Sequence, residues 1–309
     1  MATTRWNDKE IHDINHVLNK ILTHESADDS SSDKTRYTNW QTEKVFPENL
    51  KYKFNNKEIE FNYISFSYDT VTPDDGQPIE DRTTTHRGFI ILYWNGESVS
   101  YIINQKTYAL TILRKLLGYT GKNEIVQDQK YITSDFFLWL ICKVYNLENV
   151  FERDDEQKNT KNITVETIRG IKGETDDLLT KVSANGESVM NIISTLSFLL
   201  ESRKFNQICV DIKYMDHSHI ELTLDTKGTI NTSVENYCGE FDTDNERKEE
   251  VISKLYLLIY LEVFPFIYQT YLLEKDDLLW NKDANIEFLT KVTNDLSTRV
   301  KEKIEILNN

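Results

Sequence analysis

The sequence has 309 residues, of which 51 are acidic and 36 are basic, so its formal net charge is −15. A field of this sign repels phosphate backbones and anionic lipids, which disfavours nucleic acid as a partner. Hydrophobic residues make up 39% of the chain, enough for a folded core and too many for a wholly disordered protein.

The cysteines indicate a reducing compartment. Cys142, Cys209 and Cys238 are an odd number and widely spaced, which argues against a disulfide framework. The first six residues carry no apolar core of a signal peptide, so export is not expected. A cytoplasmic protein is therefore predicted.

One long apolar stretch, residues 251–273, has to be distinguished from a membrane span. It contains Lys254, Glu262 and Pro265, and each charge would cost a few kcal/mol at the centre of a bilayer. We interpret the stretch as a buried core helix and expect no membrane contact.

The first elements along the chain are a helix and a strand pair. Asn7 to Glu10 has the pattern of a capping box, and apolar residues follow at helical spacing over residues 11–22. Alternating apolar and polar residues predict a hairpin over residues 51–65. Prolines and carboxylates then predict a long exposed loop over residues 70–86.

The clearest local signal is a β-hairpin over residues 89–103. Two apolar runs flank Asn95 and Gly96. Since an Asn-Gly pair tolerates the positive φ angles of a type I′ turn, a tight turn is expected there.

Two helices are expected after this hairpin. Leucines over residues 110–117 mark the first, which should end at Gly118. The second should be capped at Thr133 or Ser134 and continue through Val144.

Residues 152–162 contain no apolar side chain and are predicted to separate two units, residues 1–151 and residues 163–309. The second unit should begin with a strand over residues 163–171. Apolar spacing of three and four predicts a helix over residues 189–200.

Two strands with one apolar and one polar face are expected next. Ile208, Val210 and Ile212 alternate with polar residues, and residues 220–224 do the same after a turn at residues 216–218. A short third strand is predicted over residues 229–234.

The remainder of the chain is predicted to be helical, over residues 246–274 with an interruption near Pro265 and then over residues 283–307. We therefore predict an α+β fold with two small, mostly antiparallel sheets. Each sheet should be covered by helices, and a long helical pair should end the chain.

The polar face of the strand pair at residues 206–227 carries a candidate reaction centre. Asp211 on one strand and the triplet from Asp225 to Lys227 on the next fit a nuclease site in which carboxylates hold Mg²⁺. Glu221 shares the strand face of Asp225, and Lys227 would stabilise developing charge. The favoured interpretation is simpler, a solvated sheet face with cross-strand charge pairing.

Histidine pairs offer a weaker metal hypothesis. His12 and His16 are four residues apart on the first predicted helix, and His217 and His219 should project to one side of a strand. No cysteine pair or HExxH motif accompanies them, so ordinary exposed histidines are favoured over zinc ligands. No cofactor is predicted, and Mg²⁺ belongs to the nuclease alternative alone.

Two surfaces favour a protein partner. Acidic loops could face a basic partner, although charge runs are usually solvated linkers. The apolar seam of the last helix would suit the preceding helix, which is the simpler explanation, or a second chain in a homodimer. The acidic side chains are Asp28, Asp29, Asp33, Asp74, Asp75, Glu80, Asp81, Glu152, Asp154, Asp155 and Glu156, and the seam is Ile286, Leu289, Leu296, Val300, Ile304 and Leu307.

We therefore expect a non-catalytic protein that binds macromolecules or assembles with them. A composition rich in Asn, Lys, Ile and Tyr suggests an intracellular microbial multi-protein system, with phage defence as one such setting. The alternative is a metal-dependent nuclease centred on residues 206–227.

Overall fold

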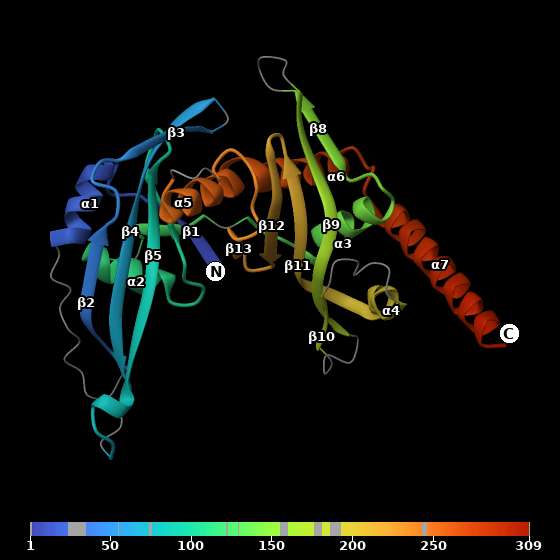
Figure 1. Cartoon of the computed structure of the whole chain (residues 1–309), viewed down its shortest axis with the longest axis horizontal. Coiled ribbons are helices and arrows are strands. Elements are labelled where there is room, and N and C mark those ends of the chain that lie inside the picture. Colours follow the sequence, from blue (N-terminus) through green and yellow to red (C-terminus); the bar gives the residue numbers. More distant parts are fainter. Residues whose placement is uncertain are drawn as a thin grey trace. The chain divides into compact units, whose positions relative to one another are not determined.

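The structure is a computed structural model (Figure 1) that forms two compact units, residues 1–129 with 245–257 and residues 130–244 with 258–309. These units divide the chain differently from the predicted linker at residues 152–162. Strands β8 (Val150–Asp154) and β9 (Thr160–Thr175) border that segment and pair with each other inside the second unit. The structure describes residues 2–23, 35–54, 56–73, 76–121, 123–128, 130–154, 160–175, 181–185, 193–242 and 246–308.

The α+β class is confirmed, but the prediction of two small sheets is wrong. Among the residues that the structure describes, thirteen strands follow one large sheet order. Neighbouring strands pair in the antiparallel sense within both units. The alternation rule found only the strands with a clean apolar face. It missed short or polar strands, among them β1 (Ala2–Asp8), β2 (Arg36–Lys44), β7 (Ile125–Gln127), β8 and β10 (Lys181–Asn185).

The first unit contains seven of the strands, ordered β7-β1-β6-β5-β4-β2 with β3 also on β4. Helices α1 (Ile14–Thr23) and α2 (Ala109–Leu117) bury their apolar residues in the core cluster on one face of this sheet. The strands are β1 (Ala2–Asp8), β2 (Arg36–Lys44), β3 (Leu50–Phe54), β4 (Lys57–Val71), β5 (Thr83–Trp94), β6 (Val99–Ile103) and β7 (Ile125–Gln127).

The start of the chain departs from its sequence pattern. The expected capping box lies in and after strand β1, and helix α1 begins later, where the Asp13 side chain accepts a hydrogen bond from the Asn15 N–H. The expected loop at residues 70–86 is also shorter, because β4 and β5 extend into it around a 3-10 turn, η1 (Glu80–Arg82).

The hairpin over residues 89–103 is confirmed as the β5–β6 pair, but its turn is not type I′. Trp94 pairs with Val99, so four residues form the loop. Gly96 has a φ of 100°, whereas the Asn95 side chain accepts hydrogen bonds from two following N–H groups. Asn95 therefore stabilises the loop through its side chain rather than through a left-handed backbone.

A buried carboxylate ties β1 to the rest of the first unit. Asp8 accepts hydrogen bonds from the hydroxyls of Tyr101 on β6 and Tyr119 after α2. It also accepts from the backbone N–H groups of Glu10 and Ile11. Burial, and then the charge of Asp8, raise the pKa of Tyr101 well above its usual value, so this hydroxyl stays a donor.

The second unit contains six strands in the order β10-β9-β11-β12-β13, with β8 also paired to β9. Helix α3 (Ser134–Tyr145) packs against β9 and β11, and its expected cap is confirmed because the Thr133 hydroxyl accepts from the Phe136 N–H. The remaining elements are β10 (Lys181–Asn185), α4 (Ile193–Glu201), β11 (Ser202–Tyr214), β12 (His217–Asp225), β13 (Ile230–Thr232), α5 (Lys248–Leu258, whose first ten residues belong to the first unit), the π-helix η3 (Ile259–Val263), α6 (Phe264–Asp276) and α7 (Lys282–Asn308).

The predicted C-terminal helical pair is wrong, because α7 is one long helix that packs on α3 and α4. The Tyr145 ring of α3 lies 5.7 Å from the Phe288 ring, and its hydroxyl donates to Asp295. The Lys291 ammonium donates to Asn146 at 2.8 Å. These contacts hold the first half of α7, and the chain beyond residue 300 is exposed.

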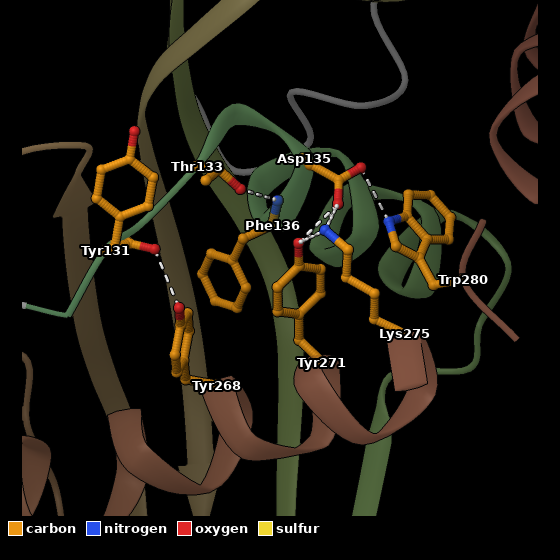
Figure 2. A network of polar contacts seen from close by, with 8 residues as sticks. All are labelled: Tyr131, Thr133, Asp135, Phe136, Tyr268, Tyr271, Lys275 and Trp280. Carbon is orange, nitrogen blue, oxygen red and sulfur yellow. Dashed lines mark hydrogen bonds and ion pairs between the residues drawn. The ribbon is translucent and has the colours of Figure 1, made fainter. Parts of the chain in front are cut away.

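A polar network joins α6 to the first turn of α3 (Figure 2). The Asp135 carboxylate accepts from the Tyr271 hydroxyl at 2.6 Å, the Lys275 ammonium at 3.2 Å and the Trp280 indole N–H at 3.2 Å. Burial alone would raise the pKa of Asp135, but these hydrogen bonds outweigh it and lower the pKa.

This network predicts how acid destabilises the second unit. A carboxylate whose pKa is lowered by folding stabilises the fold fully above its unfolded pKa of about 3.9, and loses that contribution as the pH falls through the folded value. We expect the free energy of unfolding to fall with acid less steeply in Asp135→Asn than in the wild type. Urea unfolding between about pH 6 and pH 3 measures both slopes; parallel curves would contradict the assignment.

One helical stretch, Lys248–Asp276, is long and apolar enough to cross a membrane by length and composition. However, 78% of its most apolar 18-residue segment is buried inside the protein. This is the behaviour of a core helix in a soluble-type fold, and the interpretation of residues 251–273 as a buried helix is confirmed.

Candidate functional site

The central strands of the second unit present one apolar and one polar face, as their alternation predicts. Ile208, Val210 and Ile212 on β11 are buried, as are the apolar residues of β12. The polar face contains Glu166 and Arg169 on β9, Cys209 and Asp211 on β11, and His219, Glu221 and Thr223 on β12. The third strand expected after Gly228 is present as β13.

Asp211 is the unusual member of this face because it is only 3% exposed. Its Oδ2 atom accepts two hydrogen bonds from the Arg169 guanidinium, at 2.5 Å and 3.2 Å. Its Oδ1 atom is buried and has no hydrogen-bond partner. Since buried carboxylate oxygens are normally paired, half of this carboxylate lacks a partner.

The four residues of the nuclease hypothesis do not converge on one point. Asp211 lies directly opposite Glu221, whereas Asp225 lies opposite Gln207, four residues further along both strands. Four residues of strand separate Asp211 from Asp225 by about 13 Å. The Asp225 carboxylate also accepts from the N–H groups of Lys227 and Thr229, so it shapes the turn that contains Lys227.

A different set surrounds Asp211. Glu166, Asp211 and His219 each offer one ligand atom, and these atoms all lie within 4.8 Å of one another. The Nδ1 atom of His219 is 3.6 Å from Asp211 Oδ2. Glu166 and His219 are exposed, so the set combines one buried and two accessible groups. Sequence reasoning missed Glu166, since neither periodicity nor spacing tells which strand lies beside β11.

A β-bulge explains why His219 belongs to this set. The pairing of β11 with β12 shifts between Ile212 and Tyr214, so that two residues of β12 lie opposite one of β11. His219 adopts a φ of 55° there. The prediction that His217 and His219 share a side is wrong, because His217 is buried against Tyr237, with its Nδ1 2.6 Å from that hydroxyl.

The other histidine pair is not a helical pair. His12 precedes α1, and its Nδ1 atom lies 2.9 Å from the Glu97 carbonyl oxygen. His16 is exposed on α1.

Gly118 ends α2 with a φ of 61°, as expected for a left-handed helix terminus.

The acidic loops are described in part. Glu80 and Asp81 form the turn η1, and Glu152 and Asp154 belong to β8. Asp28, Asp29, Asp33, Asp74, Asp75, Asp155 and Glu156 lie outside the described residues.

Two of the three cysteines are poor nucleophiles. Burial raises the pKa of Cys142 to about 11, and burial also raises the pKa of Cys209. Both are therefore protonated thiols at neutral pH, whereas a thiolate is the reactive form. Cys238 is exposed and free.

An open pocket of about 420 Å³ lies on β2, β4 and β5 in the first unit. Its lining includes Arg87 and Glu43, of opposite charge, together with the hydroxyl groups of Thr42, Ser65 and Ser67. This mixed lining does not favour one class of charged ligand, so the Asp211 region remains the stronger candidate.

Comparisons with known proteins add no assignment to this geometry: no protein-family model matches the sequence, and no curated protein is significantly similar to it.

Proposed function

We propose that this protein is a non-catalytic assembly subunit that binds a partner protein through the exposed end of helix α7. The observation that carries the proposal is an apolar stripe with nothing packed on it among the described residues. Val300, Ile304 and Leu307 are 40%, 52% and 74% exposed, although they recur at the spacing of one helix face.

The two halves of α7 differ in what covers them. Phe288 and Val292 in the first half are buried. The stripe begins where this cover ends and continues for two turns. Polar residues at this end of the helix would preserve the fold equally well. Three solvent-exposed apolar side chains at this end therefore favour a binding role.

The charges beside the stripe favour a particular kind of partner. Lys301 and Lys303 flank Ile304 on either side, in the positions equivalent to e and g of a coiled coil, whereas Glu302 lies on the opposite face. In an antiparallel second copy, e positions face e positions and g positions face g positions, which would place lysine against lysine. In a parallel copy, Lys303 would face Asn308 and Lys301 would face Leu296, so neither lysine would meet a carboxylate. The partner should therefore present an apolar stripe flanked by carboxylates.

The test compares stripe variants with a control on the same helix. We expect Ile304→Gln combined with Leu307→Gln to weaken partner binding by at least about tenfold, because two apolar contacts are lost while helix propensity is kept. Lys301→Glu with Lys303→Glu should weaken it and remove its salt dependence. Glu302→Gln, on the opposite face, should bind like the wild type.

The partner is first captured from host extract through a photo-crosslinking residue at position 304, and then titrated in purified form with each variant by calorimetry. A captured protein whose affinity is unchanged in the stripe variants would overturn the proposal. So would light scattering that shows a stable homodimer of the wild type that the stripe variants dissociate, because a second copy would then occupy the stripe.

The cytoplasmic location and the role in a microbial multi-protein system, with phage defence as the example, belong to this proposal and are supported by composition alone. The nuclease hypothesis has less support, because Asp211 and Asp225 lie about 13 Å apart along the strands. A net charge of −15 also opposes binding of a polyanion.

A further inference from the structure

We propose that Glu166, Asp211 and His219 bind a divalent transition-metal ion such as Zn²⁺ or Mn²⁺. The three residues lie on adjacent, hydrogen-bonded strands, β9, β11 and β12, so the sheet itself fixes their spacing. This site is independent of helix α7 and uses only Asp211 from the nuclease hypothesis.

The unpartnered oxygen of Asp211 is the second observation behind the site. This carboxylate is 3% exposed, and Arg169 hydrogen-bonds its Oδ2 atom, while Oδ1 has no partner. The other oxygen, Oδ2, is 3.6 Å from His219 Nδ1, so the carboxylate lies beside the imidazole of the triad. A buried carboxylate oxygen requires a donor or a cation, and an ion held by the triad supplies one.

The donor set selects the class of ion. One imidazole and two carboxylates suit Zn²⁺ or Mn²⁺, whereas Mg²⁺ and Ca²⁺ favour oxygen ligands alone. Ligand atoms at about 2.1 Å from a tetrahedral ion are about 3.4 Å apart. The present limit of 4.8 Å therefore requires side-chain shifts of at most about 1.4 Å, and Glu166 and His219 are exposed and able to make them.

The geometry also indicates what kind of centre this is. Three protein ligands leave a coordination position open for water or another small ligand, whereas structural zinc sites are closed by four protein ligands. Arg169 next to Asp211 adds a positive charge, which moderates the affinity for a cation and favours an anionic fourth ligand.

The experiment titrates the EDTA-treated full chain with Zn²⁺ and with Mn²⁺ by calorimetry. We expect one ion per chain, with the affinity lowered at least about tenfold in Glu166→Gln and in His219→Ala. Both side chains are exposed, so these variants should fold as the wild type does, which circular dichroism checks. Co²⁺ supplies a second readout, because its visible absorption on binding should disappear in His219→Ala.

Two controls separate the triad from general metal binding. His16→Ala removes an exposed histidine elsewhere, and Glu221→Gln removes a carboxylate directly opposite Asp211 but outside the triad. Both should bind like the wild type. The proposal is overturned if the wild type shows no saturable binding, if Glu166→Gln and His219→Ala bind normally, or if Glu221→Gln is as damaging as Glu166→Gln.

Discussion

Replacement of Asp8 with alanine is expected to lower the free energy of unfolding of the first unit by about 3–5 kcal/mol. The carboxylate accepts from two tyrosine hydroxyls and two backbone N–H groups. Its loss leaves the Tyr101 hydroxyl, which is fully buried on β6, without this acceptor. Each hydrogen bond to a charged group contributes about 1.5–3 kcal/mol to stability, and a buried donor without an acceptor lowers the stability further.

Urea unfolding followed by tryptophan fluorescence measures this loss, and a double-mutant cycle identifies its source. Tyr101→Phe removes the hydroxyl that Asp8→Ala would leave without a partner. The double variant should therefore be more stable than the sum of the single losses predicts, by about 1–2 kcal/mol. Strict additivity would show that the two side chains are not coupled.

The second large effect is expected at Arg169. Its side chain is 31% exposed, while the Asp211 side chain that it contacts is 4% exposed. Arg169→Met leaves a buried carboxylate uncompensated, which costs about 3–5 kcal/mol in fully buried pairs. Because the arginine is partly solvated, we expect about 3 kcal/mol, at the lower end. Urea unfolding of the second unit provides the measurement.

The matched variant removes both charges. In Arg169→Met with Asp211→Leu no buried charge remains, so most of the lost stability should return. A double variant that is less stable than Arg169→Met would mean that Asp211 has a stabilising role other than its pairing with Arg169.

Elements with a strong local signal could be predicted from the sequence. Helix α2 ends at Gly118, α3 is capped by Thr133, and β11 and β12 alternate apolar and polar residues, because each depends on neighbours along the chain. Strand β1 could not be predicted, since its residues Thr3, Thr4 and Arg5 are polar yet buried by tertiary contacts. The predicted sheets were too small for the same reason, because strands that are buried by tertiary contacts carry no local signal.

In the candidate site, too, the residues with a local signal could be predicted and those that depend on tertiary pairing could not. The sequence placed Asp211 and Glu221 on one polar face, and the structure pairs them. It could not place Glu166, which precedes Asp211 by 45 residues and reaches it only because β9 pairs with β11. Nor could it place His219, whose orientation depends on a bulge that leaves no mark in the residue pattern.

That bulge also constrains insertions and deletions in this protein's evolution. It amounts to one inserted residue, and deleting Ser218 would restore regular alternation to β12. His217 and His219 would then be consecutive residues of a regular strand and would still point to opposite faces, one packed with aromatic rings and one beside Asp211. Lineages should therefore tolerate the loss of residue 218 better than the loss of a residue from the regular part of β12, where one deletion exchanges the two faces of the strand.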